Sequence, residues 1–296
     1  MEGKYLKRFS GILLCIAFTF SLVGCYFKST NEFNKNDMQS EEGIVEGIAT
    51  ATVQGKIDEP KPQESVTNQP KPETIEQSPE AVGQSQVPTQ RKTVVVDPGH
   101  GAGGNSEKEL QSPDSNIMKI KDGGGCEGVS TKIPEYVVTM QISLKLKALL
   151  EQNNINVILT KTDNSYSPGN IERAEVGNNN NATLSIRIHC DSADSSSAKG
   201  ASMLVPGNTG YASSISSISR RYGDVVLNKL VSEVCMYNRG VIERNDMTGF
   251  NWSKVPVILV ELGFMSNPEE DLLLTSDDYQ NKIAKGLCDG IVEAIR

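Results

Sequence analysis

The sequence predicts an α/β fold: a single domain over residues 92–296, in which a mostly parallel, twisted sheet is flanked by helices on both faces. Short runs rich in valine, isoleucine and leucine alternate with longer amphipathic stretches, the order expected of a parallel sheet with crossover helices. The composition changes near residue 92, where a segment rich in proline and glutamate gives way to this apolar pattern. The remaining length suits one domain with a sizeable core.

The first strand is expected at Val94–Val96, a β-branched run closed by the turn residues Asp97-Pro98-Gly99. A loop of more than thirty residues is expected next, from Gly101 to Pro134. Loops of that length in a compact domain are usually functional or mobile.

A helix is expected to begin at Glu135, with Pro134 setting up its start. Apolar residues then recur at helical spacing at Val138, Ile142, Leu146, Leu149 and Leu150. Further strands are predicted at 155–161, 183–189, 200–205 and 255–262, and further helices at 170–177, 216–235 and 277–295.

The first 24 residues have the pattern of a secretory signal. Basic residues precede an apolar run from Ile12 to about Val23, which is shorter than the roughly 20 residues of a membrane-spanning helix. The ending Leu22-Val23-Gly24-Cys25 resembles the lipobox of bacterial lipoproteins, which implies that Cys25 is lipidated after cleavage. The alternative is an uncleaved, marginal anchor with an incidental cysteine. In either case the rest of the chain is expected outside the cytoplasm.

Residues 25–91 are interpreted as the lipidated cysteine and a disordered linker. The segment holds six of the thirteen prolines and many glutamates and glutamines, so it cannot bury enough apolar surface to offset its chain entropy. The whole chain has a formal net charge of −8, and nothing in its pattern suggests a nucleic-acid partner.

Four cysteines lie in the predicted domain and show no CxxC pairing: Cys126, Cys190, Cys235 and Cys288. We expect buried thiols. A disulfide is the alternative, because the compartment is not the cytosol.

The chain contains only two histidines, His100 and His189, and both follow or end a predicted strand. The carboxyl ends of strands in open α/β sheets are where sites form, and neutral imidazole is the commonest metal ligand. The alternative for each is a strand-end histidine that bonds only its own loop.

Two glutamates extend this pattern. Glu135 falls on the apolar stripe of its helix, where an unpaired carboxylate is costly to bury. Glu261 ends the apolar strand that contains Pro256. Two histidines and one carboxylate form the three-ligand set of catalytic zinc, and the other carboxylate is then available to carry a proton.

At these residues the chain resembles the zinc-dependent N-acetylmuramoyl-L-alanine amidases of bacterial cell walls. The family's opening DPGHG stands at Asp97–Gly101, and its closing E-x-G-F-x-S-N stands at 261–267. Its helical glutamate and its strand reading SIH match Glu135 and the region of His189. The resemblance implies zinc held by His100, Glu135 and His189, with Glu261 as the catalytic base. It also implies cleavage of the amide between N-acetylmuramic acid and L-alanine of the stem peptide.

Two features depart from the family pattern. Arg187 stands where the family usually has serine, on the same face of its strand as His189, so we expect it to bind a substrate carboxylate or to alter zinc affinity. The loop after His100 is long, and Glu127 within it is a rival ligand to Glu135, although it has no helix to position it.

The single tryptophan, Trp252, precedes the strand that ends in Glu261. Two roles are open for it: stacking on a sugar ring of the substrate, or packing in the core.

We expect a monomer whose partners are peptidoglycan strands and, through its lipid anchor, the membrane. The alternatives to an amidase are a catalytically inactive peptidoglycan-binding lipoprotein and a zinc peptidase that acts on the stem.

Overall fold

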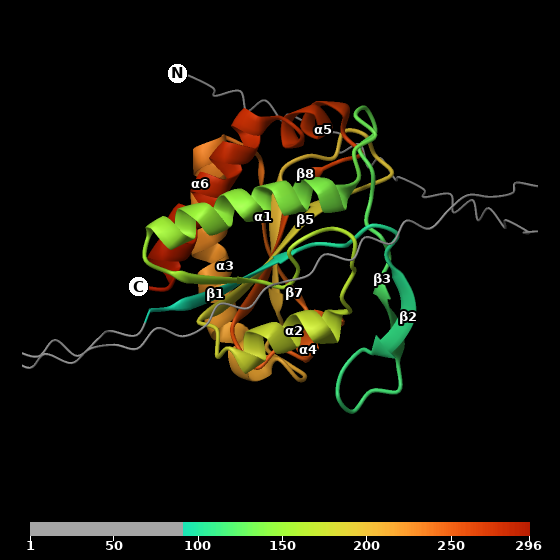
Figure 1. Cartoon of the computed structure of the whole chain (residues 1–296), viewed down its shortest axis with the longest axis vertical. Helices are drawn as coiled ribbons and strands as arrows, with labels where there is room; N and C mark the ends of the chain where they lie inside the picture. Colours follow the sequence, from blue (N-terminus) through green and yellow to red (C-terminus); the bar gives the residue numbers. More distant parts are fainter. Residues whose placement is uncertain (1–90) are drawn as a thin grey trace, which may run out of the picture. The chain divides into compact units, whose positions relative to one another are not determined.

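A computed structural model describes residues 91–296 of the chain (Figure 1). The expected signal, Cys25 and the linker through residue 90 lie outside the described residues. Within residues 91–296 no helix is long and apolar enough to cross a membrane.

A six-stranded sheet in the order β4-β1-β5-β8-β6-β7 forms the centre of the domain. Its strands are β1 (Thr93–Pro98), β4 (Asn156–Leu159), β5 (Leu184–Asp191), β6 (Ala201–Pro206), β7 (Asn238–Arg244) and β8 (Val257–Phe264). All neighbouring pairs are parallel except β6 and β8, which are antiparallel. The predicted mostly parallel sheet is therefore confirmed.

Helices cover both faces of this sheet, as expected (Figure 1). On one face lie α1 (Glu135–Gln152), α3 (Ser213–Val234) and α6 (Asp277–Ala294), and α6 packs against both of the others. On the other face lie α2 (Asn170–Asn179) and the short α4 (Thr248–Asn251). The short α5 (Pro268–Leu274) follows β8.

Alternation along the strands divides the core between the two faces. In β8, Ile258 and Val260 belong to the large cluster under α1, α3 and α6, whereas Val257 and Leu259 belong to the smaller cluster with Phe250. Successive side chains of a strand point to opposite faces, so an apolar run without alternation is the pattern of a strand buried on both sides.

One prediction was wrong. The segment predicted as a structureless loop, Gly101 to Pro134, contains a separate antiparallel hairpin of β2 (Asn105–Leu110) and β3 (Met118–Asp122). Its strands read NSEKEL and MKIKD, and the first has almost no apolar residues. The hairpin forms because one face is anchored: Glu109 of β2 accepts hydrogen bonds from the backbone N–H groups of Asn170 and Ile171, at the start of α2. The sequence pattern also missed β7, α4 and α5.

Candidate metal centre

The candidate site lies where the carboxyl ends of β1, β5 and β8 meet. In the sheet register Pro98 pairs with Ile188, and His189 pairs with Glu261. His100 follows β1 by two residues and has the left-handed φ of 57°. Few residues other than glycine adopt this backbone conformation, so His100 is held in an uncommon conformation at the site.

His100, Glu135 and His189 come together in the structure, each offering one ligand atom within 4.8 Å of the others. The Oε1 atom of Glu135 lies 3.4 Å from Nε2 of His100 and 3.1 Å from Nδ1 of His189. The two imidazole rings are nearly perpendicular, with centroids 4.8 Å apart.

Glu135 is buried at the first turn of α1 and is held by backbone donors on both oxygens. Cys126 N–H donates to its Oε2 atom and Cys190 N–H donates to its Oε1 atom, each at 3.0 Å. Burial alone raises the pKa of this carboxyl, but the two histidines outweigh burial and hold the pKa well below its usual range. The rival Glu127 is exposed, and its backbone pairs with Pro134. The structure therefore brings Glu135, and not Glu127, beside the histidines.

Gly125 closes the site from the hairpin side. Its φ is 77°, and a Cβ atom at this position would lie 2.8 Å from Oε2 of Glu135 and 2.9 Å from the ring of His100. Both the backbone conformation and the close approach require glycine here.

The sequence analysis missed Asp122, the last residue of β3. Its Oδ1 atom lies 2.5 Å from Nδ1 of His100 and accepts from Gly124 N–H at 2.9 Å, while Ser167 Oγ donates to its Oδ2 atom. Burial lowers the pKa of His100, but Asp122 and Glu135 outweigh it and raise the pKa to about 9. The only sequence signal was that Asp122 precedes a run of three glycines.

Asp271 on α5 is a second residue that the sequence analysis missed. It is fully buried and accepts hydrogen bonds from the N–H groups of Ser130 and Thr131, at 2.7 and 2.8 Å. Thr131 Oγ1 also donates to it, at 2.6 Å. This carboxylate fixes the loop that leads into Glu135.

Glu261 lies within β8 and pairs with His189 of β5, and its Oε2 atom is buried without a hydrogen-bond partner within residues 91–296. Burial first, and then the charges of Glu135 and Asp191, raise the pKa of Glu261 well above its usual range. The Nε2 atom of His189 is likewise buried and unpartnered in this part of the chain.

These unpartnered atoms test whether the donor set fits a metal. Leaving a buried polar atom unpaired costs roughly 1–3 kcal/mol, so two in one site call for a partner. Two imidazoles and a carboxylate are the donor types that catalytic zinc uses, and a metal-binding histidine commonly donates its other N–H to a carboxylate, as His100 can to Asp122. The residues present therefore fit a zinc ion.

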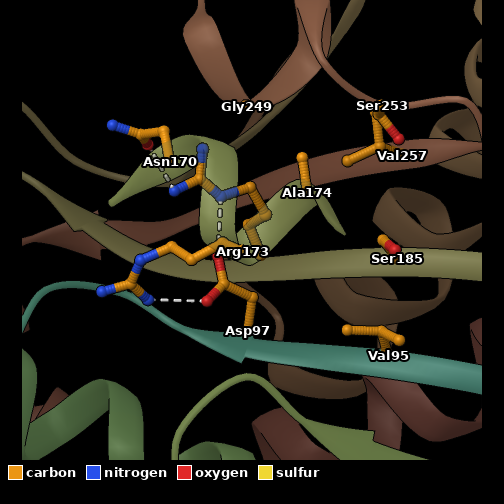
Figure 2. A pocket seen from close by; sticks show the side chains of 10 residues that line it. Val95, Asp97, Asn170, Arg173, Ala174, Ser185, Gly249, Ser253 and Val257 are labelled. Atoms are coloured by element: carbon orange, nitrogen blue, oxygen red, sulfur yellow. Dashed lines mark hydrogen bonds and ion pairs between the residues drawn. The ribbon is translucent and has the colours of Figure 1, made fainter. Parts of the chain in front are cut away.

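Arg187 points toward this centre, but most of its guanidinium is engaged. Its Nε atom donates to Asp97 at 2.7 Å and its Nη2 atom donates to Asn170 at 2.9 Å. Figure 2 shows Asp97 also paired with Arg173, whose Nη1 atom lies 2.6 Å from the carboxylate. Arg187, Arg173 and Asn170 also line a cavity of about 110 Å³ beside His100 and His189. A role for Arg187 toward substrate stays a prediction.

Trp252 follows α4 and is only partly buried. Its Nε1 atom donates to the carbonyl of Leu110 in the hairpin, at 3.0 Å. It lines a second cavity rather than the one beside the histidines. Stacking of Trp252 on a sugar ring stays a prediction.

The four cysteines of the described part are free thiols. Cys190 and Cys288 are buried as expected, whereas Cys235 is exposed at the end of α3. Cys126 is half-buried, with its Sγ atom 3.4 Å from Oε2 of Glu135.

Comparisons with known proteins identify the family of the domain. The profile of a family described as N-acetylmuramoyl-L-alanine amidase matches residues 94–293. A protein named probable cell wall amidase LytH, from Staphylococcus aureus, is 26% identical over 204 residues, which is 69% of this chain. The chain spans 58% of the length of that relative.

Two solved structures are similar as well. One is the catalytic domain of CwlV, an N-acetylmuramoyl-L-alanine amidase from Bacillus (Paenibacillus) polymyxa var. colistinus. It is 27% identical with a TM-score of 0.56, covering 68% of this chain and 97% of that one. The other is an N-acetylmuramoyl-L-alanine amidase from Clostridium difficile 630. It is 26% identical with a TM-score of 0.57, covering 69% of this chain and 97% of that one.

Proposed function

Because the chain belongs to the N-acetylmuramoyl-L-alanine amidase family, we propose that it cleaves the amide bond between the lactyl group of N-acetylmuramic acid and L-alanine of the peptidoglycan stem peptide. The observation that carries this proposal is the convergence of His100, Glu135 and His189 next to Glu261. Residues 92–296 form the catalytic domain in this proposal.

The two histidines and Glu135 would hold the metal. Asp122 orients the His100 ring, and the N–H groups of Cys126 and Cys190 orient the Glu135 carboxylate, so these two side chains are held in place by the protein itself. When bound, Zn²⁺ would act as a Lewis acid, which polarises a carbonyl oxygen and lowers the pKa of water toward neutrality.

Glu261 would carry the proton. Its buried, unpartnered Oε2 atom is free to accept a proton from the attacking water and to pass it to the nitrogen of the leaving L-alanine. Burial and the neighbouring carboxylates raise its pKa, which makes Glu261 a stronger base for the proton of the water than an ordinary glutamate.

Arg187 and Trp252 are the proposed substrate contacts. A stem peptide carries carboxylates, and Arg187 lines the cavity beside the histidines. If Arg187 recognises a stem carboxylate, stems with amidated carboxyl groups should show a higher KM than acidic stems, with a smaller effect on kcat. Equal KM values for the two kinds of stem would leave Arg187 as a partner of Asp97 only.

Digestion of purified sacculi by the full chain tests the reaction. Mass analysis of the products should find peptides with a free amino group on L-alanine and glycan strands without peptides, and Glu261→Gln should release neither. A new amino terminus inside the stem would instead favour the zinc peptidase. Binding to sacculi without any cleavage would favour the inactive peptidoglycan-binding lipoprotein.

Lipidation of Cys25 and attachment to the outer side of the cell membrane complete the proposal. The sequence ending at Cys25 supports it, and the linker to residue 91 would let a monomeric domain reach wall near the membrane. Cys25→Ala should release the protein from membranes or leave its precursor unprocessed. A mature membrane-bound form that survives both Cys25→Ala and inhibition of lipoprotein processing would show an uncleaved anchor instead.

A further inference from the structure

A second cavity, of about 490 Å³, lies outside the metal centre and shares none of the four residues assigned to it. Its walls come from four separate parts of the chain: the hairpin turn, α2, the start of α3 and the segment after α4. The residues are Pro113, Glu175, Tyr211, Ser214 and the run from Asn251 to Lys254. Volumes of this size are typical of ligand pockets.

Two aromatic rings line this cavity. The indole of Trp252 is anchored by its edge through the bond from Nε1 to the carbonyl of Leu110, and Tyr211 is 44% exposed. Aromatic side chains offer a large apolar surface at low entropic cost and favour sites that are apolar on one side and wet on the other. A pyranose ring has this mixed character, with an apolar C–H face and a rim of hydroxyl groups.

Hydrogen bonds from α2 hold one wall of the cavity, and its two charged lining residues are of opposite sign. Asn178 of α2 donates to the carboxylate of Glu175 at 3.2 Å and to the carbonyl of Trp252 at 3.0 Å, and its side-chain oxygen accepts from Lys254 N–H at 2.7 Å. The cavity thus holds one acidic and one basic side chain on a prearranged frame. This balance favours an uncharged ligand with hydroxyl and amide groups over an anion or a cation.

The second cavity and the cavity beside the histidines lie along the same two elements. Helix α2 lines both, with Asn170 and Arg173 at the cavity beside the histidines and Glu175 at the second. The β2–β3 hairpin links the two regions: Ile120–Gly123 line the cavity beside the histidines, and Pro113 at the turn lines the second cavity. One ligand that occupies both would extend along this hairpin, as a strand of linked sugar units can.

We infer that this second cavity is a saccharide subsite, which holds N-acetylated amino sugars of the same glycan strand whose peptide is cleaved at the metal centre. The inference rests on the proposed function. It assigns Tyr211 and Trp252 to binding of the strand away from the scissile bond.

Trp252 is the only tryptophan of the chain, so the intrinsic fluorescence of the protein reports on this cavity. We would titrate the full chain with peptide-free glycan strands, which contain no bond for the enzyme to cut. The inference requires a saturable change in tryptophan emission, with an affinity that Tyr211→Ala weakens about tenfold, the loss expected for one aromatic contact. Tyr237→Ala, at an exposed tyrosine next to β7, is the matched control and should bind as the unmodified chain does.

Kinetics supply the second readout. Tyr211→Ala should raise the ratio of the KM for long strands to the KM for a single disaccharide-peptide about tenfold, because only the long substrate reaches both places. An unchanged ratio, or an emission change that Tyr211→Ala leaves intact, would overturn the subsite. Failure of the unmodified chain to cleave either substrate would instead count against the proposed function, and strand binding is measured independently of cleavage.

Discussion

The Nδ1 atom of His100 lies 2.5 Å from the Oδ1 atom of Asp122, although the strands that carry the two residues belong to different sheets. His100 follows the central strand β1, whereas Asp122 ends the separate β2–β3 hairpin. The hairpin thus fixes which nitrogen of His100 remains free to face Glu135 and His189. Removing this one contact should affect the metal before it affects the fold.

We expect Asp122→Asn to weaken zinc binding about 10- to 100-fold, the usual effect of losing a carboxylate behind a metal-binding histidine. Competition with a chromogenic chelator at fixed pH measures the affinity. Ser167→Ala, which removes only the donor to the other Asp122 oxygen, should have a smaller effect. Asp163→Asn, at an exposed aspartate, is the control. Equal affinity in Asp122→Asn and in the control would mean that His100 needs no orienting partner.

Zinc affinity should depend steeply on pH. In the metal-free protein the pKa of His100 is raised to about 9, so below that pH a proton occupies the ring and must leave when zinc binds. The apparent affinity should therefore rise about tenfold per pH unit between pH 6 and 8, as one proton is released per ion. Proton release in weakly buffered solution measures this directly. In Asp122→Asn the pKa of His100 falls, and the dependence should level off at a lower pH.

Substitutions should separate the residues that hold zinc from the one that moves the proton. His100→Ala, Glu135→Ala and His189→Ala should each lose bound zinc, because each removes one of three ligands. Glu261→Gln should keep zinc and lose turnover, since it keeps the shape but cannot accept a proton. Zinc content by mass spectrometry and cleavage of sacculi give the two readouts. Full zinc in Glu135→Ala together with lost zinc in Glu127→Ala would reverse the ligand assignment.

Asp97 should contribute to stability in a way that acid removes. Burial raises its pKa, but Arg173 and Arg187 outweigh burial and hold the pKa well below its usual range. A carboxylate with a depressed pKa stabilises the fold above about pH 4, and this contribution is lost as pH falls toward the folded-state pKa.

Asp97→Asn should therefore lower the free energy of unfolding by about 3–5 kcal/mol at pH 7, because two buried guanidinium groups lose their shared partner. Urea unfolding at pH 7 and pH 3 should show the gap between variant and unmodified chain narrowing in acid. A gap that stays constant between these two pH values would mean that the charge of Asp97 is not what stabilises the fold.

The sequence by itself determined the sheet apart from its edge strand β7, most of the helices and the candidate metal residues. A buried parallel strand appears in the sequence as a local apolar run, and α1 appears as apolar residues at helical spacing. The local pattern is therefore enough to predict these elements. His100, His189 and Glu261 were recognisable because each follows or ends such a run, and Glu135 because it lies on the apolar stripe of its helix.

Only the tertiary structure decided what lies around these residues. The β2–β3 hairpin has no apolar alternation that would mark it. It is held instead by two hydrogen bonds: Glu109 of β2 accepts from the backbone at the start of α2, and Trp252 donates to the carbonyl of Leu110. Asp122 contacts His100 from 22 positions away in the chain. Asp271 holds the loop before Glu135 from 140 or more positions away. The engagement of Arg187 by Asp97 and Asn170 is likewise a meeting of three elements. Such contacts depend on how the elements pack. A sequence pattern reflects only interactions between residues that are close together in the chain.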